Sequence, residues 1–236
     1  MDKFTRKDMK TDRFAEQVQH SLRFVTSHSR QTLLYSGGAL LLILVSAVAY
    51  YVRQSQQTTR QQTLVSALRI HEGVVGPAAG PGDPSATFPT KEAKEQAQAK
   101  AFQDVISKHA GSNEASVAAY HLGAIAADAG KMDEAEKHFK TAAASGGKDY
   151  ASTANFSLAQ LYVFSGKSNE AEKILRALVD SPTTLVSKEQ ATIALARVLA
   201  KSKPAEAKKL LDPLQKDKNP VIARNALAAY GELGLQ

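Results

Sequence analysis

The sequence predicts an all-α protein, with a single N-terminal transmembrane helix followed by an α-solenoid of helix pairs. Three observations predict this fold class. Alanine is abundant and aromatic residues make up only 6% of the 236 residues, a composition that favours helices over strands. One long stretch carries no charge, and later segments repeat one another at a nearly constant offset. The chain has no cysteine, which excludes disulfides and cysteine nucleophiles.

The charge distribution argues against nucleic-acid binding. The net charge is +7, but residues 1–30 carry seven Lys or Arg against four acids, and residues 31–52 carry no charge. The remaining charges are of mixed sign and form no dense basic stripe. We therefore expect no nucleic-acid partner.

Residues 1–30 are expected to form a cytoplasmic segment with an amphipathic helix. Apolar residues recur in it at helical spacing: Phe14, Val18, Leu22 and Val25. Two interpretations stay open, a helix resting on the inner leaflet and a dedicated partner site.

Residues 31–52 are expected to form the transmembrane helix. The apolar run from Leu33 to Val52 spans about 30 Å as a helix, which matches the hydrocarbon core of a bilayer. The excess of Lys and Arg before this run places the N-terminus in the cytoplasm. The alternative is a cleaved signal peptide ending at Ala47-Val48-Ala49, although the apolar run is longer than signal peptides use.

Residues 53–90 are expected to form a juxtamembrane helix and a linker. The first part is polar with a partial apolar stripe, whereas Gly73 to Pro89 is rich in Gly and Pro.

Residues 91–236 are expected to form a repeat domain. Residues 118–145 and 154–181 align at an offset of 36, and residues 192–217 form a third copy. Each copy reads as helix, tight turn, helix. Gly130 and Gly166 fit the left-handed position after a first helix, and Pro204 fits the start of a second helix. Small residues mark the expected helix crossings, and larger ones follow in the core: Ala135, Ala171, Ala207, Phe139, Leu175 and Leu211.

These residues carry a family resemblance. The pairs Leu122-Gly123 and Leu158-Ala159, then Tyr162, and the Ala and Phe positions above resemble the tetratricopeptide repeat. The usual Trp near the start of a unit is missing, and the third copy lacks the turn glycine.

The layout of the whole chain is similar to that of the YfgM-type ancillary subunits of the bacterial SecYEG translocon. That resemblance implies a single-pass protein of the bacterial inner membrane, with its C-terminal domain in the periplasm. It also implies protein partners: translocon subunits, a periplasmic chaperone or client polypeptides.

The sequence contains no recognisable catalytic or metal-binding motif. Its six histidines form no HExxH pair, and there is no nucleophile elbow or phosphate-binding loop. We expect no enzyme activity, no cofactor, no metal and no small-molecule substrate.

The function is therefore expected to lie in a protein-binding groove. First helices line the concave face of such a solenoid, and by repeat register the groove residues are Tyr120, Phe156, Gln160, Phe164, Ile193 and Arg197. The alternative is that Tyr120 and Phe156 are buried between adjacent units.

The expected function is a membrane-anchored extracytoplasmic scaffold that assists secreted-protein handling. A structural scaffold of a division, outer-membrane or export assembly is the alternative.

Overall fold

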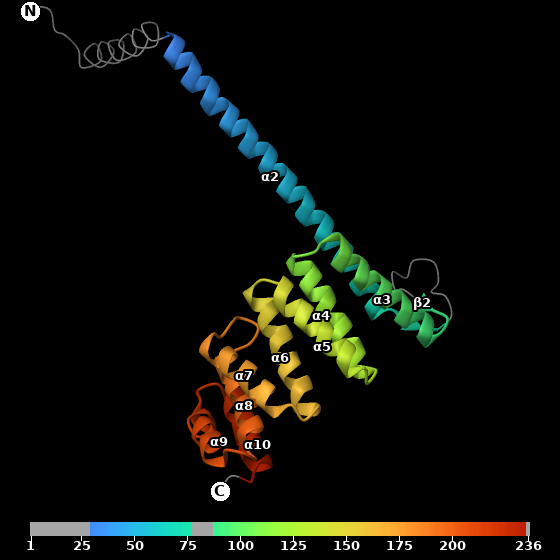
Figure 1. Cartoon of the computed structure of the whole chain (residues 1–236), viewed down its shortest axis with the longest axis vertical. Helices are drawn as coiled ribbons and strands as arrows, with labels where there is room; N and C mark the ends of the chain where they lie inside the picture. Colours follow the sequence, from blue (N-terminus) through green and yellow to red (C-terminus); the bar gives the residue numbers. More distant parts are fainter. Residues whose placement is uncertain (1–28, 77–86, 235–236) are drawn as a thin grey trace, which may run out of the picture. The chain divides into compact units, whose positions relative to one another are not determined.

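The computed structural model describes residues 29–76 and 87–234, and over these ranges the protein is all-α (Figure 1). The expected amphipathic helix in residues 1–30 lies almost entirely outside the described residues. The helices are α2 (Ser29–Glu72), α3 (Lys91–Lys108), α4 (Asn113–Asp128), α5 (Met132–Ser145), α6 (Lys148–Phe164), α7 (Ser168–Asp180), α8 (Lys188–Leu199), α9 (Pro204–Leu211), the 3-10 helix η1 (Leu214–Lys216) and α10 (Pro220–Glu232).

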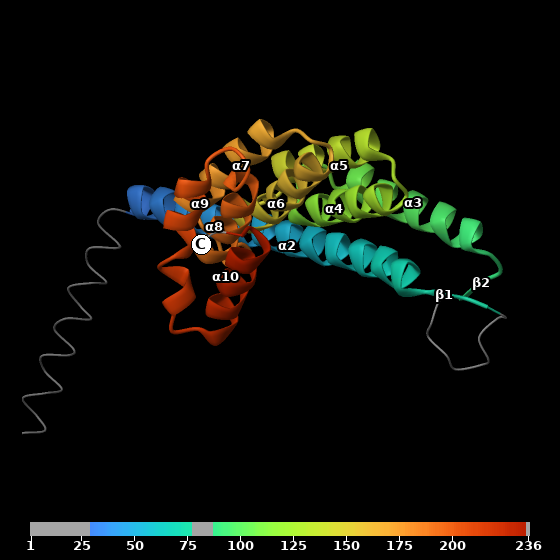
Figure 2. The same cartoon turned by 90° about the horizontal axis from the view of Figure 1, so that it is seen from below.

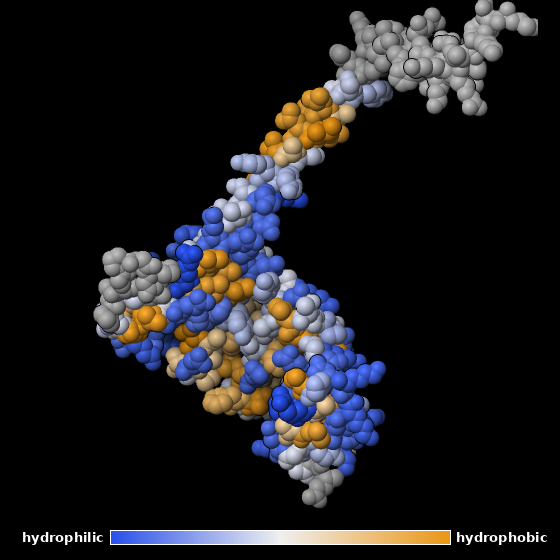
Figure 3. Space-filling model, turned by 180° about the vertical axis from the view of Figure 1, so that it is seen from behind, coloured by the Kyte–Doolittle hydropathy of each residue, from blue (hydrophilic) through white to orange (hydrophobic). Residues whose placement is uncertain are grey.

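Helix α2 is long and apolar enough to span a membrane. It continues through the polar residues after Val52 to Glu72 without a break. From Leu34 to Val52 its side chains are exposed and uncharged, and they form the hydrophobic surface of α2 that is orange in Figure 3. Because this surface has no packing partner among the described residues, it is the part of the chain suited to lipid.

The chain divides into two compact units, Met1–Thr58 and Thr59–Gln236. The second unit begins inside α2, whose last turns pack against α3 and α4. Ala67 is 2% exposed and belongs to a core cluster with Phe102 and Val105 of α3 and Leu122 of α4. Two polar contacts tie α2 to the α3 region: the Gln98 amide donates to the His71 carbonyl at 3.2 Å, and the His109 ring lies 3.2 Å from the Thr63 hydroxyl.

Two short strands close the ends of the Gly/Pro-rich segment that the sequence predicts as a linker. Strands β1 (Val74–Val75) and β2 (Thr87–Phe88) pair in parallel, with Val74 opposite Thr87 and Val75 opposite Phe88 (Figure 2). The Gly76 amide donates to the Phe88 carbonyl at 3.0 Å. The sequence does not predict this pair because two residues are too few to show a strand periodicity.

Successive helices from α3 to α9 pack on one another, and α10 packs on α8, α9 and η1. The small residues predicted at the helix crossings, Ala135, Ala171 and Ala207, are fully buried. The core positions that follow, Phe139, Leu175 and Leu211, are at most 4% exposed. The predicted spacing of apolar residues is therefore confirmed.

The two turn glycines have the left-handed backbone that the sequence predicts. Gly130 has a φ of 74° and Gly166 a φ of 73°. After each glycine a lysine amide donates back to the preceding helix: Lys131 to the Ala126 carbonyl at 2.8 Å, and Lys167 to the Tyr162 carbonyl at 2.7 Å. This is the hydrogen-bond pattern with which many helices end at glycine.

The third turn closes without glycine. The Lys203 amide donates to the Leu199 carbonyl at 2.7 Å, and Pro204 begins α9 at its first position. Proline is tolerated there because that amide has no partner within the helix.

Candidate protein-binding groove

A groove of about 690 Å³ lies between α6, α8 and α10. These three helices occupy the first-helix position of successive pairs. The groove is lined by Phe156, Gln160, Val163, Leu175, Ser187, Gln190, Ile193, Ala194, Arg197, Val198, Ile222 and Asn225.

Four of the six predicted groove residues line this groove. Phe156 and Gln160 come from α6, and Ile193 and Arg197 come from α8. They lie together because residues three or four apart share a face of a helix. Phe156 is half-buried, and Ile193 is only 6% exposed, so Ile193 belongs to the floor.

The other two predicted residues are not among those that line the groove. Tyr120 is half-buried on α4, where its ring lies 5.8 Å from the ring centres of both Phe139 and His121. Phe164 ends α6 and is 78% exposed. Tyr120 is therefore partly buried against the core, and Phe164 stands on the surface beside the groove residue Val163.

Helix α10 supplies a wall that repeat register alone does not predict. Ile222 and Asn225 line the groove from α10, which the sequence shows only as a terminal helix after the third copy. The signal that would have found them is the position of α10 in the sequence. Because α10 follows α9, the second helix of a pair, it takes the place that the first helix of a further pair would have.

The rim of the groove is polar. Arg197 pairs with Glu232 of α10 at 3.2 Å, and both side chains are about half exposed. Gln160, Gln190 and Asn225 add amide groups that both donate and accept hydrogen bonds. An apolar floor with amide and charged groups at its rim suits a peptide segment, whose backbone needs both donors and acceptors.

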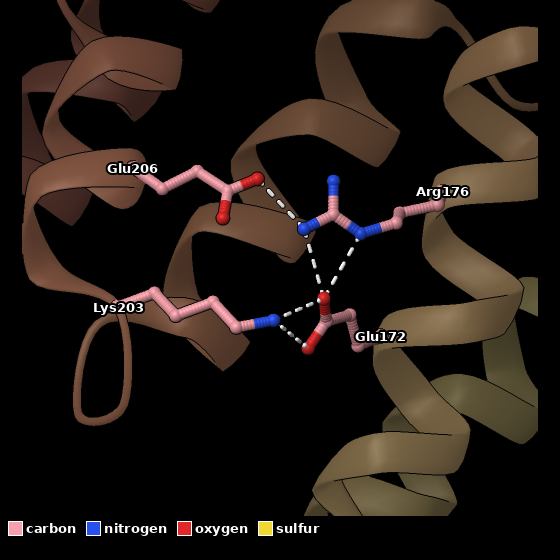
Figure 4. Close-up of polar contacts among 4 residues, drawn as sticks. All are labelled: Glu172, Arg176, Lys203 and Glu206. Atoms are coloured by element: carbon pink, nitrogen blue, oxygen red, sulfur yellow. Dashed lines mark hydrogen bonds and ion pairs between the residues drawn. The ribbon is translucent and has the colours of Figure 1, made fainter.

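Ion pairs at equivalent positions tie successive helix pairs together. Lys167 contacts Glu136 at 2.9 Å, and Lys203, 36 residues later, contacts Glu172 at 2.8 Å. Arg176 bonds Glu172 at 2.8 Å and Glu206 at 2.7 Å, so a single guanidinium joins α7 to α9 (Figure 4).

These contacts lower the pKa of both glutamates. Hydrogen bonds from Lys140 and Lys167, with a further one from the Tyr162 hydroxyl, lower the pKa of Glu136 to about 2. Lys203 and Arg176 lower the pKa of Glu172 in the same way. Each carboxylate is held ionised by cations that it binds, which is a structural arrangement and not that of a general acid.

The histidines of the second unit do not assemble a metal site. Over residues 29–76 and 87–234, no group of three or more His, Asp or Glu side chains is placed to hold a metal ion. His121 stacks on Phe102 with ring centres 5.1 Å apart and lies 5.1 Å from His71. Burial, followed by the neighbouring His71, lowers the pKa of His121, so His121 packs as a neutral ring.

No known protein family, curated protein or solved structure matches the chain in sequence or structure comparison.

Proposed function

We propose that this protein is a membrane-anchored scaffold whose extracytoplasmic, tetratricopeptide-like helical repeats bind a segment of a partner protein. The groove between α6, α8 and α10 is the proposed binding site, and its lining is the observation that carries the proposal. It combines an apolar floor with polar rim groups and is built by helices at equivalent repeat positions. Solenoids of helix pairs commonly bind partners along such a face.

The proposed membrane topology has the N-terminus in the cytoplasm and the repeat unit in the periplasm. The exposed, uncharged surface of α2 from Leu34 to Val52 supports a membrane span. The excess of positive charge in residues 1–30 supports the orientation.

The topology can be tested with single cysteines, since the chain has none of its own. Ser202→Cys puts a thiol in an exposed turn of the repeat unit, and Thr11→Cys puts one before the proposed span. A membrane-impermeant maleimide added to spheroplasts should label the first variant and not the second. The reverse labelling, or labelling of a shortened chain at Ser202→Cys alone, would overturn the anchored topology.

The proposed partners follow from the resemblance in chain layout to the YfgM-type translocon subunits. They are translocon channel subunits, a periplasmic chaperone or secreted clients. We therefore propose that the scaffold acts near the translocon, has no enzymatic activity and needs no cofactor.

The groove proposal is tested by in-cell crosslinking from a photoreactive residue at Gln190, which is exposed on the groove rim. The expected products are channel subunits and a chaperone, identified by mass spectrometry. Recovery of a division or outer-membrane assembly without the channel would favour the structural envelope scaffold instead.

A pair of adjacent substitutions provides the matched control. Val163→Asp places a charge in the groove, whereas Phe164→Asp places the same charge one residue outside it. Both side chains are exposed, Val163 at 46% and Phe164 at 78%, so neither change should unfold the unit. Crosslinking should fall in Val163→Asp only. Equal loss in both variants, or no loss in either, would defeat this groove as the binding site.

A further inference from the structure

A second groove, of about 540 Å³, lies between α5, α6 and α7 and shares none of the residues of the first. Its floor is apolar and is formed by Ala151, Leu158, Ile174, Ala177 and Leu178. Its polar residues include four charged groups, of which three are lysines: Lys140, Lys148, Lys173 and Glu170.

The equivalent face one repeat later is bridged. There Arg176 of α7 reaches Glu206 of α9 at 2.7 Å while it also holds Glu172 (Figure 4). The residues 36 positions earlier are Lys140 and Glu170. Lys140 bonds Glu136 at 2.7 Å on its own helix, and among the described residues no hydrogen bond or ion pair joins it to Glu170. A lysine presents one ammonium where an arginine presents a fork of donors, so the bridge that spans α7 and α9 is not made between α5 and α7.

The charges along this groove favour an anionic occupant. Within the described residues, the side chains of Lys148 and Lys173 make no ion pair or hydrogen bond, whereas Lys140 forms an ion pair with Glu136. Glu170 is the one acidic residue of the lining. The apolar floor requires that the occupant also carry an apolar face, which a nucleic acid or a simple anion does not.

We propose that this second groove binds an acidic amphipathic helix of a partner protein. Its apolar face would cover Ile174, Ala177 and the neighbouring floor, and its carboxylates would pair with Lys148 and Lys173. This surface is separate from the groove between α6, α8 and α10, so the scaffold has two binding sites of different chemistry.

The test uses the full chain in nanodiscs of zwitterionic lipid and two labelled helical peptides, one of Leu and Glu and one of Leu and Lys in the same pattern. Fluorescence anisotropy should show the acidic peptide binding at least about tenfold more tightly, with the difference shrinking as salt is raised. Equal binding of the two peptides would overturn the proposal.

Variants of the groove separate charge from shape. Lys148→Glu with Lys173→Glu should weaken binding of the acidic peptide by about tenfold or more. Lys94→Glu with Lys100→Glu makes the same change of charge on α3, outside the groove, and should leave binding unchanged. Lys140→Arg keeps every charge but introduces the fork that bridges α7 and α9, so it should close the groove and weaken binding.

Three further outcomes would overturn the proposal: an equal loss from the α3 variant, unchanged binding in Lys140→Arg, or displacement of the peptide by vesicles of phosphatidylglycerol. The last would assign the groove to a lipid surface. None of these variants touches the first groove, so their results are independent of the Val163→Asp experiment.

Discussion

A single methyl group at Gly123 tests how closely α4 and α5 are packed. A Cβ on Gly123 would lie 2.7 Å from Cδ1 and from Cε1 of Phe139, and the Phe139 ring is only 4% exposed. The ring must therefore shift, and overpacking of this kind costs about 1–3 kcal/mol. Replacing a helical glycine by alanine by itself raises the free energy of unfolding by about 1 kcal/mol, because alanine has the higher helix propensity. We expect Gly123→Ala to lower the free energy of unfolding by about 1 kcal/mol.

The next repeat shows how the cost is relieved. Ala159 and Leu175, 36 residues after Gly123 and Phe139, belong to one core cluster. The later repeat thus has the larger residue, Ala159, in place of Gly123 and the smaller residue, Leu175, in place of Phe139. Phe139→Leu alone should cost about 1 kcal/mol, because it leaves unfilled space. In the double variant the new methyl group fills part of that space, so the two changes should couple favourably by at least about 1 kcal/mol.

The assay is urea unfolding of the detergent-solubilised chain, followed by far-ultraviolet circular dichroism. Gly231→Ala is the matched control, because Gly231 lies in α10 and a Cβ there meets no atom within 4 Å. This control should stabilise the protein by about 0.5–1 kcal/mol. The reasoning is refuted if Gly123→Ala is as stabilising as Gly231→Ala, or if the costs of the two changes at Gly123 and Phe139 simply add.

Two further predictions use the same unfolding assay. Gly166→Ala should destabilise by about 1 kcal/mol because the φ of 73° disfavours any residue with a Cβ, and a neutral effect would show that this turn relaxes. Glu136→Gln should cost up to about 1 kcal/mol at neutral pH. The pKa of Glu136 is lowered to about 2 from 4.5, so its stabilising effect is complete above about pH 4.5 and disappears as the pH falls toward 2. The difference between wild type and Glu136→Gln should therefore shrink across that range, and a difference independent of pH would contradict the assignment.

Much of the helical architecture is predictable because its signals are local. Gly130 and Gly166 specify the turn conformation by themselves, and the 36-residue offset carries the core positions from one helix pair to the next. The contribution of residues 59–72 was not predictable from a partial apolar stripe. Ala67 is buried only because Phe102 and Val105 of α3 lie against it, which is a tertiary contact with no counterpart in local sequence.

The candidate groove was predictable where repeat register holds and not where it ends. Phe156, Gln160, Ile193 and Arg197 line the groove because equivalent residues of equivalent helices share a face. Tyr120 departs from this pattern because its ring packs against Phe139 and is half-buried there. Phe164 was predicted in the groove because it lies near these positions in the repeat, but it stands at the end of its helix and is 78% exposed.

The ion pairs between successive helix pairs have a consequence for how the protein loses its structure. In an array where each unit touches only its neighbours, the ends would otherwise fray one unit at a time. Lys167 with Glu136, and Lys203 with Glu172, add a bond across each of two junctions, and Arg176 adds a second at the later one. Releasing α9 and the turn before it removes Lys203 and Glu206, so Glu172 and Arg176 then pair only with each other on α7. These ion pairs add to the coupling between neighbouring units, so a partner that binds one unit should also stabilise the unit next to it.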